Sequence, residues 1–122
     1  MNSGVSYTAL APDTEERFTS LRRELGVSTF GLNQIILRPG QRGRIHRHKT
    51  QEEVYFVASG TLQFKLEDEV LDVPAGTVVR IAPAVVRSVW NEGPDDAVLI
   101  MCSIKSDDPE GDHETVADFW PE

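Results

Sequence analysis

From Phe30 onward, hydrophobic and polar residues alternate over short stretches that are separated by turn residues. The clearest stretch is TLQFKLED at residues 61–68, where Leu62, Phe64 and Leu66 fall on one side of an extended chain. A period of two predicts strands with one buried face. Comparable stretches cover residues 30–38, 44–49, 52–59, 69–73, 77–83, 85–91 and 97–104. Many short strands with frequent turns indicate an all-β sandwich or barrel.

The residues before Phe30 follow a helical period instead. Apolar side chains recur on one helical face within residues 13–25. Asp13 and the acid at Glu16 have the spacing of a capping box, and Gly26 is a suitable stop. The pattern therefore predicts one short N-terminal helix over about residues 13–25.

A chain of 122 residues is expected to fold as one domain. We predict an N-terminal segment at residues 1–29, a barrel at residues 30–105 and an acidic tail at residues 106–122. The tail is expected to be irregular, with Phe119 and Trp120 anchoring it on the barrel or on a second subunit.

The net charge of −8 is concentrated in the tail. The last seventeen residues contain seven of the 20 acids and no Lys or Arg, which leaves 13 acids and all 12 bases in the rest of the chain. Phosphate backbones would be repelled by the tail and drawn little by the body, so nucleic-acid binding is not expected. With one cysteine, no basic and apolar leader and no long apolar run, we expect a cytoplasmic protein without a membrane span.

The candidate chemistry lies in the stretch IHRHKTQEEVYF, residues 45–56. Residues two apart on a strand face the same way, so His46 and His48 are expected to point together. Glu53 begins the next strand, and on an adjacent strand its carboxylate could meet the two rings. Two histidines and one carboxylate form a facial triad that suits divalent transition metals.

The spacing around these residues resembles the first sequence motif of the cupin superfamily. Gly40, five residues, HxH at His46 and His48, four residues, Glu53, six residues and Gly60 reproduce that motif. The resemblance implies a double-stranded β-helix, a jelly-roll barrel in which the two histidines and the glutamate point inward as metal ligands. It also implies that Glu52 and Arg47 face outward.

The second cupin motif is only partly present. Its opening glycine and closing asparagine are matched by Gly76 and Asn91, but Arg87 stands where the family has its fourth ligand, a histidine. A guanidinium stays protonated and offers only donors, so it cannot bind a metal. Its forked donors suit a carboxylate, and the motif places Glu53 within its reach.

Two states of the site follow, and the sequence leaves both open. In one, His46, His48 and Glu53 bind a divalent transition metal (Fe, Mn, Zn, Ni or Cu), and Arg87 orients an anionic substrate. That protein would be a small enzyme of the oxygenase or isomerase type. In the other, Glu53 pairs with Arg87, no metal is bound, and the barrel is a binding module for an acidic small molecule without catalysis.

Two further residues are candidates for contact with the small molecule. Tyr55 and Arg44 share strand parity with Glu53 and His46 respectively, so regular strands would direct them toward the same cavity. A jelly-roll barrel commonly associates through its sheets, and we expect a homodimer.

Overall fold

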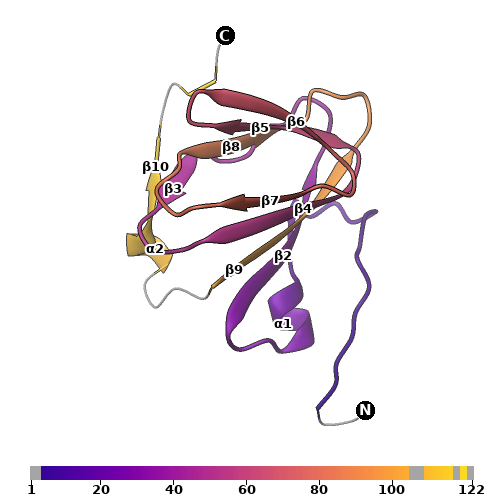
Figure 1. The fold of residues 1–122 in the computed structure, drawn as a ribbon. Coiled ribbons are helices and arrows are strands. Elements are labelled where there is room, and N and C mark those ends of the chain that lie inside the picture. The colour runs from indigo at the N-terminus through magenta and orange to yellow at the C-terminus, as the bar shows by residue number, and fades with distance from the viewer. Residues whose placement is uncertain (1–3, 105–108, 117–118, 121–122) are drawn as a thin grey trace.

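The strands of the chain form two five-stranded sheets that face each other, as the computed structural model of residues 4–104, 109–116 and 119–120 describes (Figure 1). The first sheet has the strand order β1-β2-β9-β4-β7, in which neighbouring strands run antiparallel. Its strands are β1 (Phe18–Ser20), β2 (Phe30–Leu37), β4 (Glu53–Ser59), β7 (Val78–Ile81) and β9 (Ala97–Ile104).

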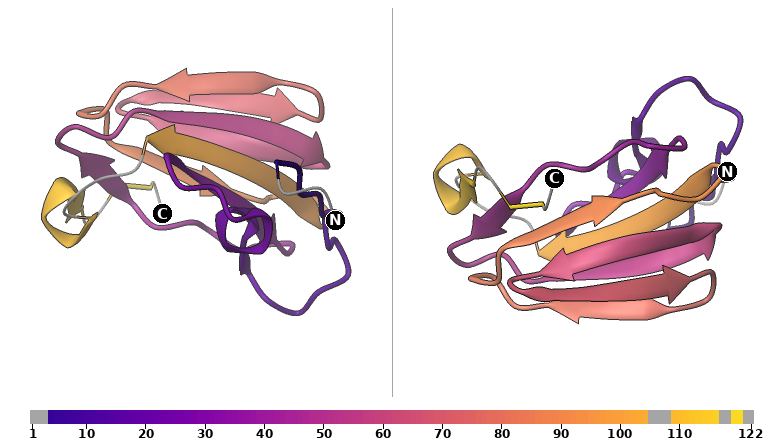
Figure 2. Two further views of the ribbon diagram at one scale, coloured as in Figure 1. Left: turned by 90° about the horizontal axis from the view of Figure 1, so that it is seen from below. Right: turned by 90° about the horizontal axis from the view of Figure 1, so that it is seen from above.

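The second sheet has the order β10-β3-β8-β5-β6 and is also antiparallel. Its strands are β3 (His46–His48), β5 (Thr61–Leu66), β6 (Glu69–Pro74), β8 (Arg87–Trp90) and β10 (His113–Thr115). The chain passes repeatedly from one sheet to the other, as views from below and above show (Figure 2). The fold is therefore the predicted all-β, double-stranded β-helix with a short helix.

The hydrophobic core lies between the two sheets. Along β5, Leu62 and Phe64 are fully buried, whereas Gln63 and Lys65 on the other face are partly exposed, as the alternation predicted. Burial of such side chains contributes roughly 1.5–3 kcal/mol each to the free energy of folding. The rest of the core comprises Ile35, Leu37, Tyr55, Val57, Val73, Ile81, Ala97 and Leu99.

The motif residues that carry no ligand atoms have structural roles. Gly40 and Gly60 have φ angles of 85° and 76°, a region that side chains with a Cβ adopt at a cost. At Gly60, a Cβ would also lie 2.8 Å from the carbonyl oxygen of Asp96. Asn91 is buried, and its amide donates to the carbonyl of Leu37 at 2.8 Å. These positions fix turns and chain crossings around the site.

The N-terminal helix is shorter than predicted. α1 spans Leu21–Leu25 instead of residues 13–25, because the residues just before it form β1 and pair with the edge of β2. The cap is Ser20 and not Asp13: its Oγ accepts a hydrogen bond at 3.1 Å from the backbone N–H three residues on. Gly26 ends the helix as predicted, with a φ angle of 75°.

The acidic tail contains regular structure, so the prediction of an irregular tail is wrong for residues 109–115. Helix α2 (Pro109–Asp112) leads into β10, which pairs with β3 and places His113 opposite His48. Figure 1 shows both elements, in yellow, beside β3 at one end of the barrel. A sheet edge supplies backbone partners that single-sequence patterns do not reveal.

The end of the tail is anchored on the barrel. Trp120 is buried, and its indole N–H donates to Oγ of Ser88 at 2.8 Å. The ammonium of Lys65 lies 3.8 Å from the centroid of the Phe119 ring. Both aromatic residues thus act as the anchors that the sequence suggested. No helix among the described residues has the length and hydropathy needed to cross a bilayer.

Candidate metal centre

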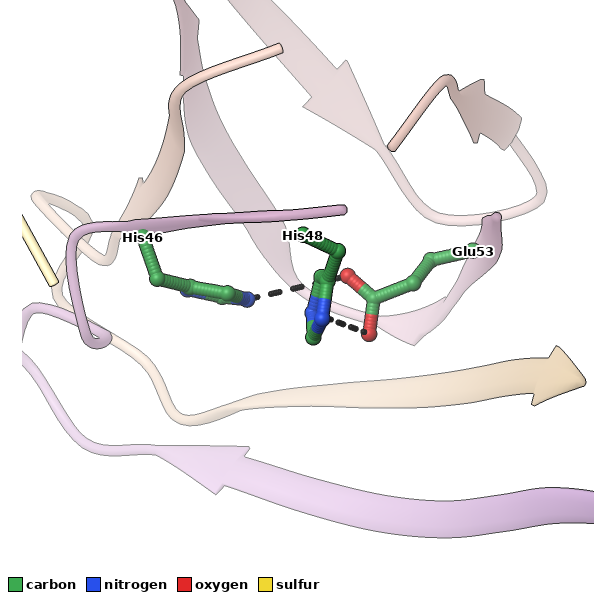
Figure 3. A group of neighbouring side chains, drawn as sticks. All are labelled: His46, His48 and Glu53. Atoms are coloured by element: carbon green, nitrogen blue, oxygen red, sulfur yellow. Dashed lines mark ion pairs between the residues drawn. The ribbon is translucent and has the colours of Figure 1, made fainter. Parts of the chain in front are cut away.

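His46 and His48 direct their rings into the barrel from β3, and Glu53 meets them from the start of β4 (Figure 3). Nε2 of His46 lies 3.7 Å from Oε1 of Glu53, and Nε2 of His48 lies 3.5 Å from Oε2. All three side chains are buried. The expectation that Glu53 reaches them from an adjacent strand is wrong, because β3 and β4 belong to different sheets. The carboxylate approaches across the interior of the barrel.

The far nitrogen of each ring is held by an acceptor. Nδ1 of His46 lies 3.1 Å from the carbonyl oxygen of Arg44, and Nδ1 of His48 lies 3.0 Å from Oδ2 of Asp112. Carbonyl and carboxylate oxygens only accept, so each Nδ1 carries a proton and donates it. In a neutral ring, Nε2 then presents a lone pair to the site. Nε2 of His48 is buried without a hydrogen-bond partner among the residues described.

The protonation of His48 follows from its position. Burial lowers its pKa below the ordinary value, and the proximity of His46 and Arg87 acts in the same direction. The charge of Glu53 and the hydrogen bond to Asp112 oppose that shift without cancelling it. His48 is therefore a neutral imidazole at neutral pH, which is the form that binds metals.

Glu53 is held as a carboxylate by its neighbours. The hydroxyl of Tyr55 donates to Oε1 at 2.6 Å, and Nη2 of Arg87 lies 3.4 Å from the same oxygen. Burial alone would raise the pKa of Glu53, but the proximity of His46, the hydrogen bond from Tyr55 and the charge of Arg87 outweigh it and lower the pKa. Burial and the charge of Glu53 raise the pKa of Tyr55 well above its ordinary value, so the phenol remains a donor.

Arg87 is fully buried, with 1% of its surface exposed. Its Nη1 donates to the carbonyls of Pro83 and Val85 at 3.0 Å and 2.8 Å. The expected pairing with Glu53 is present, but at 3.4 Å it is longer than a charge-assisted hydrogen bond. Backbone carbonyls thus satisfy much of a guanidinium that would otherwise be costly to bury.

The acidic and basic neighbours of the candidate ligands face outward, as the resemblance to the cupin motif implied. Glu52 is exposed and pairs with Arg80. Arg47 is exposed and pairs with Glu114 at 3.0 Å. The alternation along β3 and β4 therefore separates the inward ligand set from a solvated outer face.

Sequence reasoning missed Asp112. Its Oδ1 accepts from the backbone N–H and the hydroxyl of Thr50 at 2.9 Å and 2.5 Å, and its Oδ2 accepts from the backbone N–H of Gln51 at 3.3 Å. Burial raises the pKa of this carboxyl, but the hydrogen bonds from Thr50, His48 and Gln51 lower it overall. His113 is half-buried, and its ring centroid lies 6.4 Å from that of His48.

A cavity of about 280 Å³ opens onto the site. Glu53, Tyr55, Arg87 and His46 line its polar part, together with Arg44, which is exposed as a residue. Arg17, a basic residue that the sequence analysis did not single out, also lines the cavity and donates to the carbonyl of Arg42. The remaining walls are mostly apolar and comprise Phe18, Ile35, Val89, Leu99 and Met101.

The family model described as Cupin domain matches residues 33–103 of the chain. The chain belongs to the cupin family. An uncharacterized protein of Methanocaldococcus jannaschii is 28% identical over 72 residues, which are 59% of this cupin and 58% of that protein. This cupin therefore matches less than two thirds of the length of that relative.

Solved structures resemble this cupin in fold. A cupin protein of Bacteroides fragilis is 22% identical, with a TM-score of 0.73 over 84% of this chain and 86% of its own. A sugar phosphate isomerase of the cupin superfamily from Silicibacter pomeroyi is 22% identical, with a TM-score of 0.69 over 73% and 59%. A protein of Acidithiobacillus ferrooxidans with the provisional name sugar phosphate isomerase is 25% identical, with a TM-score of 0.69 over 74% and 59%.

The candidate ligand atoms of this cupin fit a divalent cation. The ligand atoms of His46, His48 and Glu53 lie within 4.8 Å of one another. Two ring lone pairs and a carboxylate are all acceptors, and acceptors that converge in a buried site need a proton or a cation between them. A metal ion would also satisfy the orphaned Nε2 of His48. Arg87 stands where the cupin motif has its fourth ligand, so three residues could hold a metal at this site.

Proposed function

We propose that this cupin is a small metal-dependent enzyme, of the oxygenase or isomerase type, acting on a small anionic compound. His46, His48 and Glu53 would bind one divalent transition metal. When bound there, the metal would polarise an oxygen atom of the substrate as a Lewis acid. A ligand set with open coordination positions supports this assignment over a closed structural site.

One observation carries the proposal: the buried Nε2 of His48 has no hydrogen-bond partner among the described residues and faces Oε2 of Glu53 at 3.5 Å. An unpartnered buried polar atom costs about 1–3 kcal/mol. A site that accepts this cost at a histidine, beside a second histidine and a carboxylate, is suited to a metal.

The cavity supports a substrate that is small and negatively charged. Its volume of about 280 Å³ lies at the lower edge of typical ligand pockets. Arg44 and Arg17 lie on its lining and would attract a carboxylate or a phosphate. Arg87 and Tyr55 are committed to Glu53 and to carbonyls, so in this proposal they hold the ligand carboxylate in place beside the substrate.

The neighbour from Acidithiobacillus ferrooxidans adds support for a charged substrate, since a sugar phosphate is an anion. This chain covers only 59% of that protein, so a phosphorylated sugar enters here as one class of anion to be tested.

A second candidate function is a metal-free module that binds an acidic molecule. The approach of Arg87 to Glu53 at 3.4 Å favours it, because a guanidinium can neutralise the carboxylate in place of a metal. The two functions differ in one measurable property, the affinity of the site for divalent metals.

The test uses the two neighbouring glutamates as a matched pair. Isothermal titration of the tag-free protein with Mn²⁺, Fe²⁺, Ni²⁺ and Zn²⁺ should give one site per chain. Glu53→Gln should weaken binding by more than about 100-fold, since it removes a charged ligand, whereas Glu52→Gln on the outer face should leave it unchanged. Equal affinities in the two variants would contradict the proposed function.

We also propose that two copies associate through the outer face of the first sheet. Exposed apolar side chains gather there on β4, β7 and β9, namely Val54, Phe56, Val78 and Ile104. Light scattering should give the mass of a dimer, and Phe56→Lys should give a monomer. Val70→Lys, at an exposed apolar position on the second sheet, is the control that should leave the dimer intact.

A further inference from the structure

We propose that Asp112 is a positioning residue of the metal centre, which fixes His48 in the tautomer that directs the Nε2 lone pair toward Glu53. Asp112 reaches the site from the acidic tail, 64 residues after His48 in the chain. Its effect on metal binding rests on the proposed function, but its effect on the ring follows from the hydrogen bonds alone.

Asp112 is held rigidly. Its side chain is buried, with a relative exposure of 5%, and its two oxygens accept from His48, from two groups of Thr50 and from the N–H of Gln51. Its backbone carbonyl accepts from the N–H of Lys49 at 2.7 Å. A carboxylate with donors on both oxygens cannot rotate without losing several of them. The acceptor facing His48 is thus fixed in direction.

The same contacts fix the loop between two of the ligands. Residues 49–52 connect β3 to β4, and residues 49–51 are the first three positions of this loop between His48 and Glu53. Asp112 accepts hydrogen bonds from all three of these residues. It therefore constrains both the orientation of the His48 ring and the conformation of the loop that leads to Glu53. Residues beyond the ligands pre-organise a site in this way.

The chemistry of the contact decides which nitrogen of His48 is available. Oδ2 of Asp112 can only accept, so Nδ1 must carry the ring proton, and Nε2 is left as a lone pair. In metal sites, a carboxylate on the far nitrogen fixes the ring orientation and makes the ligand more basic. The tail, which the sequence marked by its acidity and its aromatic anchors, is by this inference part of the site.

The direct test is the tautomer of His48 in metal-free protein, read from long-range ¹H–¹⁵N NMR couplings. Wild type should carry the proton on Nδ1. In D112N, the amide oxygen best serves the two donors of Thr50, which turns the NH₂ group toward His48 and shifts the ring proton to Nε2. A wild-type ring protonated on Nε2, or a D112N ring that keeps the wild-type tautomer, would overturn the inference.

Metal affinity provides the second readout. D112N should bind Mn²⁺ or Zn²⁺ about 10–100-fold more weakly than wild type. Glu114→Gln, an exposed acid two residues further along, should change affinity by less than about twofold, because exposed ion pairs contribute little. Wild-type affinity in D112N would contradict the inference, as would an equal loss in both variants.

The design also separates the two proposals. If wild type binds no metal, the proposed function fails, while the tautomer still decides the role of Asp112. If D112N does not fold, the wild-type tautomer is decisive without it, and Thr50→Val offers a milder change. That variant removes one donor from Oδ1, keeps the contact to His48 and should retain the Nδ1–H tautomer.

Discussion

Two segments of the barrel build the polar site, and they contribute opposite chemistry. Residues 46–53 supply acceptors: two ring nitrogens and a carboxylate that converge within 4.8 Å. Residues 82–91 supply a donor, the guanidinium of Arg87, which takes the position opposite His46 in the β3–β8 register. In the cupin motif both segments provide ligands, so this chain keeps one half of the pattern and replaces the other with a cation.

The comparison teaches that Arg87 draws its hydrogen-bond partners mainly from its own segment, residues 82–91. Arg87 is held by the carbonyls of Pro83 and Val85, and it approaches only Oε1 of Glu53. Oε2 faces the unpartnered Nε2 of His48. The guanidinium thus neutralises the carboxylate at Oε1, which also faces Nε2 of His46, and does not approach Oε2 beside His48. Glu53 would hold a metal ion while it remains the neighbour of Arg87.

The largest expected effect follows from removing an acceptor. His48→Ala should abolish measurable metal binding, a loss greater than the roughly 10–100-fold that outer partners cause. Titration calorimetry checks it. The fold should survive, since Asp112 keeps its donors from Thr50 and Gln51 when the ring and its hydrogen bond to Oδ2 are lost. If His48→Ala binds metal as wild type does, the first segment is not a ligand set.

The next largest effect is expected from restoring a histidine at position 87 in the second segment. Arg87→His should raise metal affinity at least about tenfold, which corresponds to about 1.4 kcal/mol, because it removes a cation and adds a fourth nitrogen ligand. Arg87→Gln is the matched control, since it removes the charge without adding a ligand. Equal affinities of the two variants would show that position 87 does not face the metal.

A smaller effect concerns the stability of the metal-free protein. The folded-state pKa of His48 is lowered, so below its ordinary value of 6.5 the unfolded chain takes up the proton first and stability falls as the pH falls. The pKa of Glu53 is also lowered, so a second loss begins below its ordinary value of 4.5. Urea unfolding at pH values from neutral downward measures both steps. His48→Gln should remove the first step, and its persistence would contradict this assignment.

The sequence predicted the candidate ligands better than the residues and strand pairings that hold them in place. The resemblance to the cupin motif distinguished Glu53 from Glu52, and alternation predicted which side chains of β3 and β4 turn inward. It could not predict that Glu53 arrives from the opposite sheet, because strand order depends on pairings between distant segments. Asp112 was not predictable for the same reason: seven acids of the tail look alike in sequence, and only the pairing of β10 with β3 selects one of them.

The prediction of an N-terminal helix over residues 13–25 is wrong for a related physical reason. Residues 13–25 carry a helical pattern, but the edge of β2 offers backbone partners to Phe18–Ser20, and these residues pair with it as β1. Tertiary hydrogen bonds override a modest local propensity. Gly26 was placed correctly because a left-handed helix end depends on local conformation alone.

The central claim is that His46, His48 and Glu53 hold a metal ion beside Arg87. The most direct test is elemental analysis of the wild-type protein, purified without a histidine tag and without chelators. We predict one transition metal ion per chain, retained through gel filtration and absent from His48→Ala. Metal-free protein that also fails to bind added Fe²⁺, Mn²⁺, Zn²⁺, Ni²⁺ or Cu²⁺ would contradict the claim and favour the metal-free binding module.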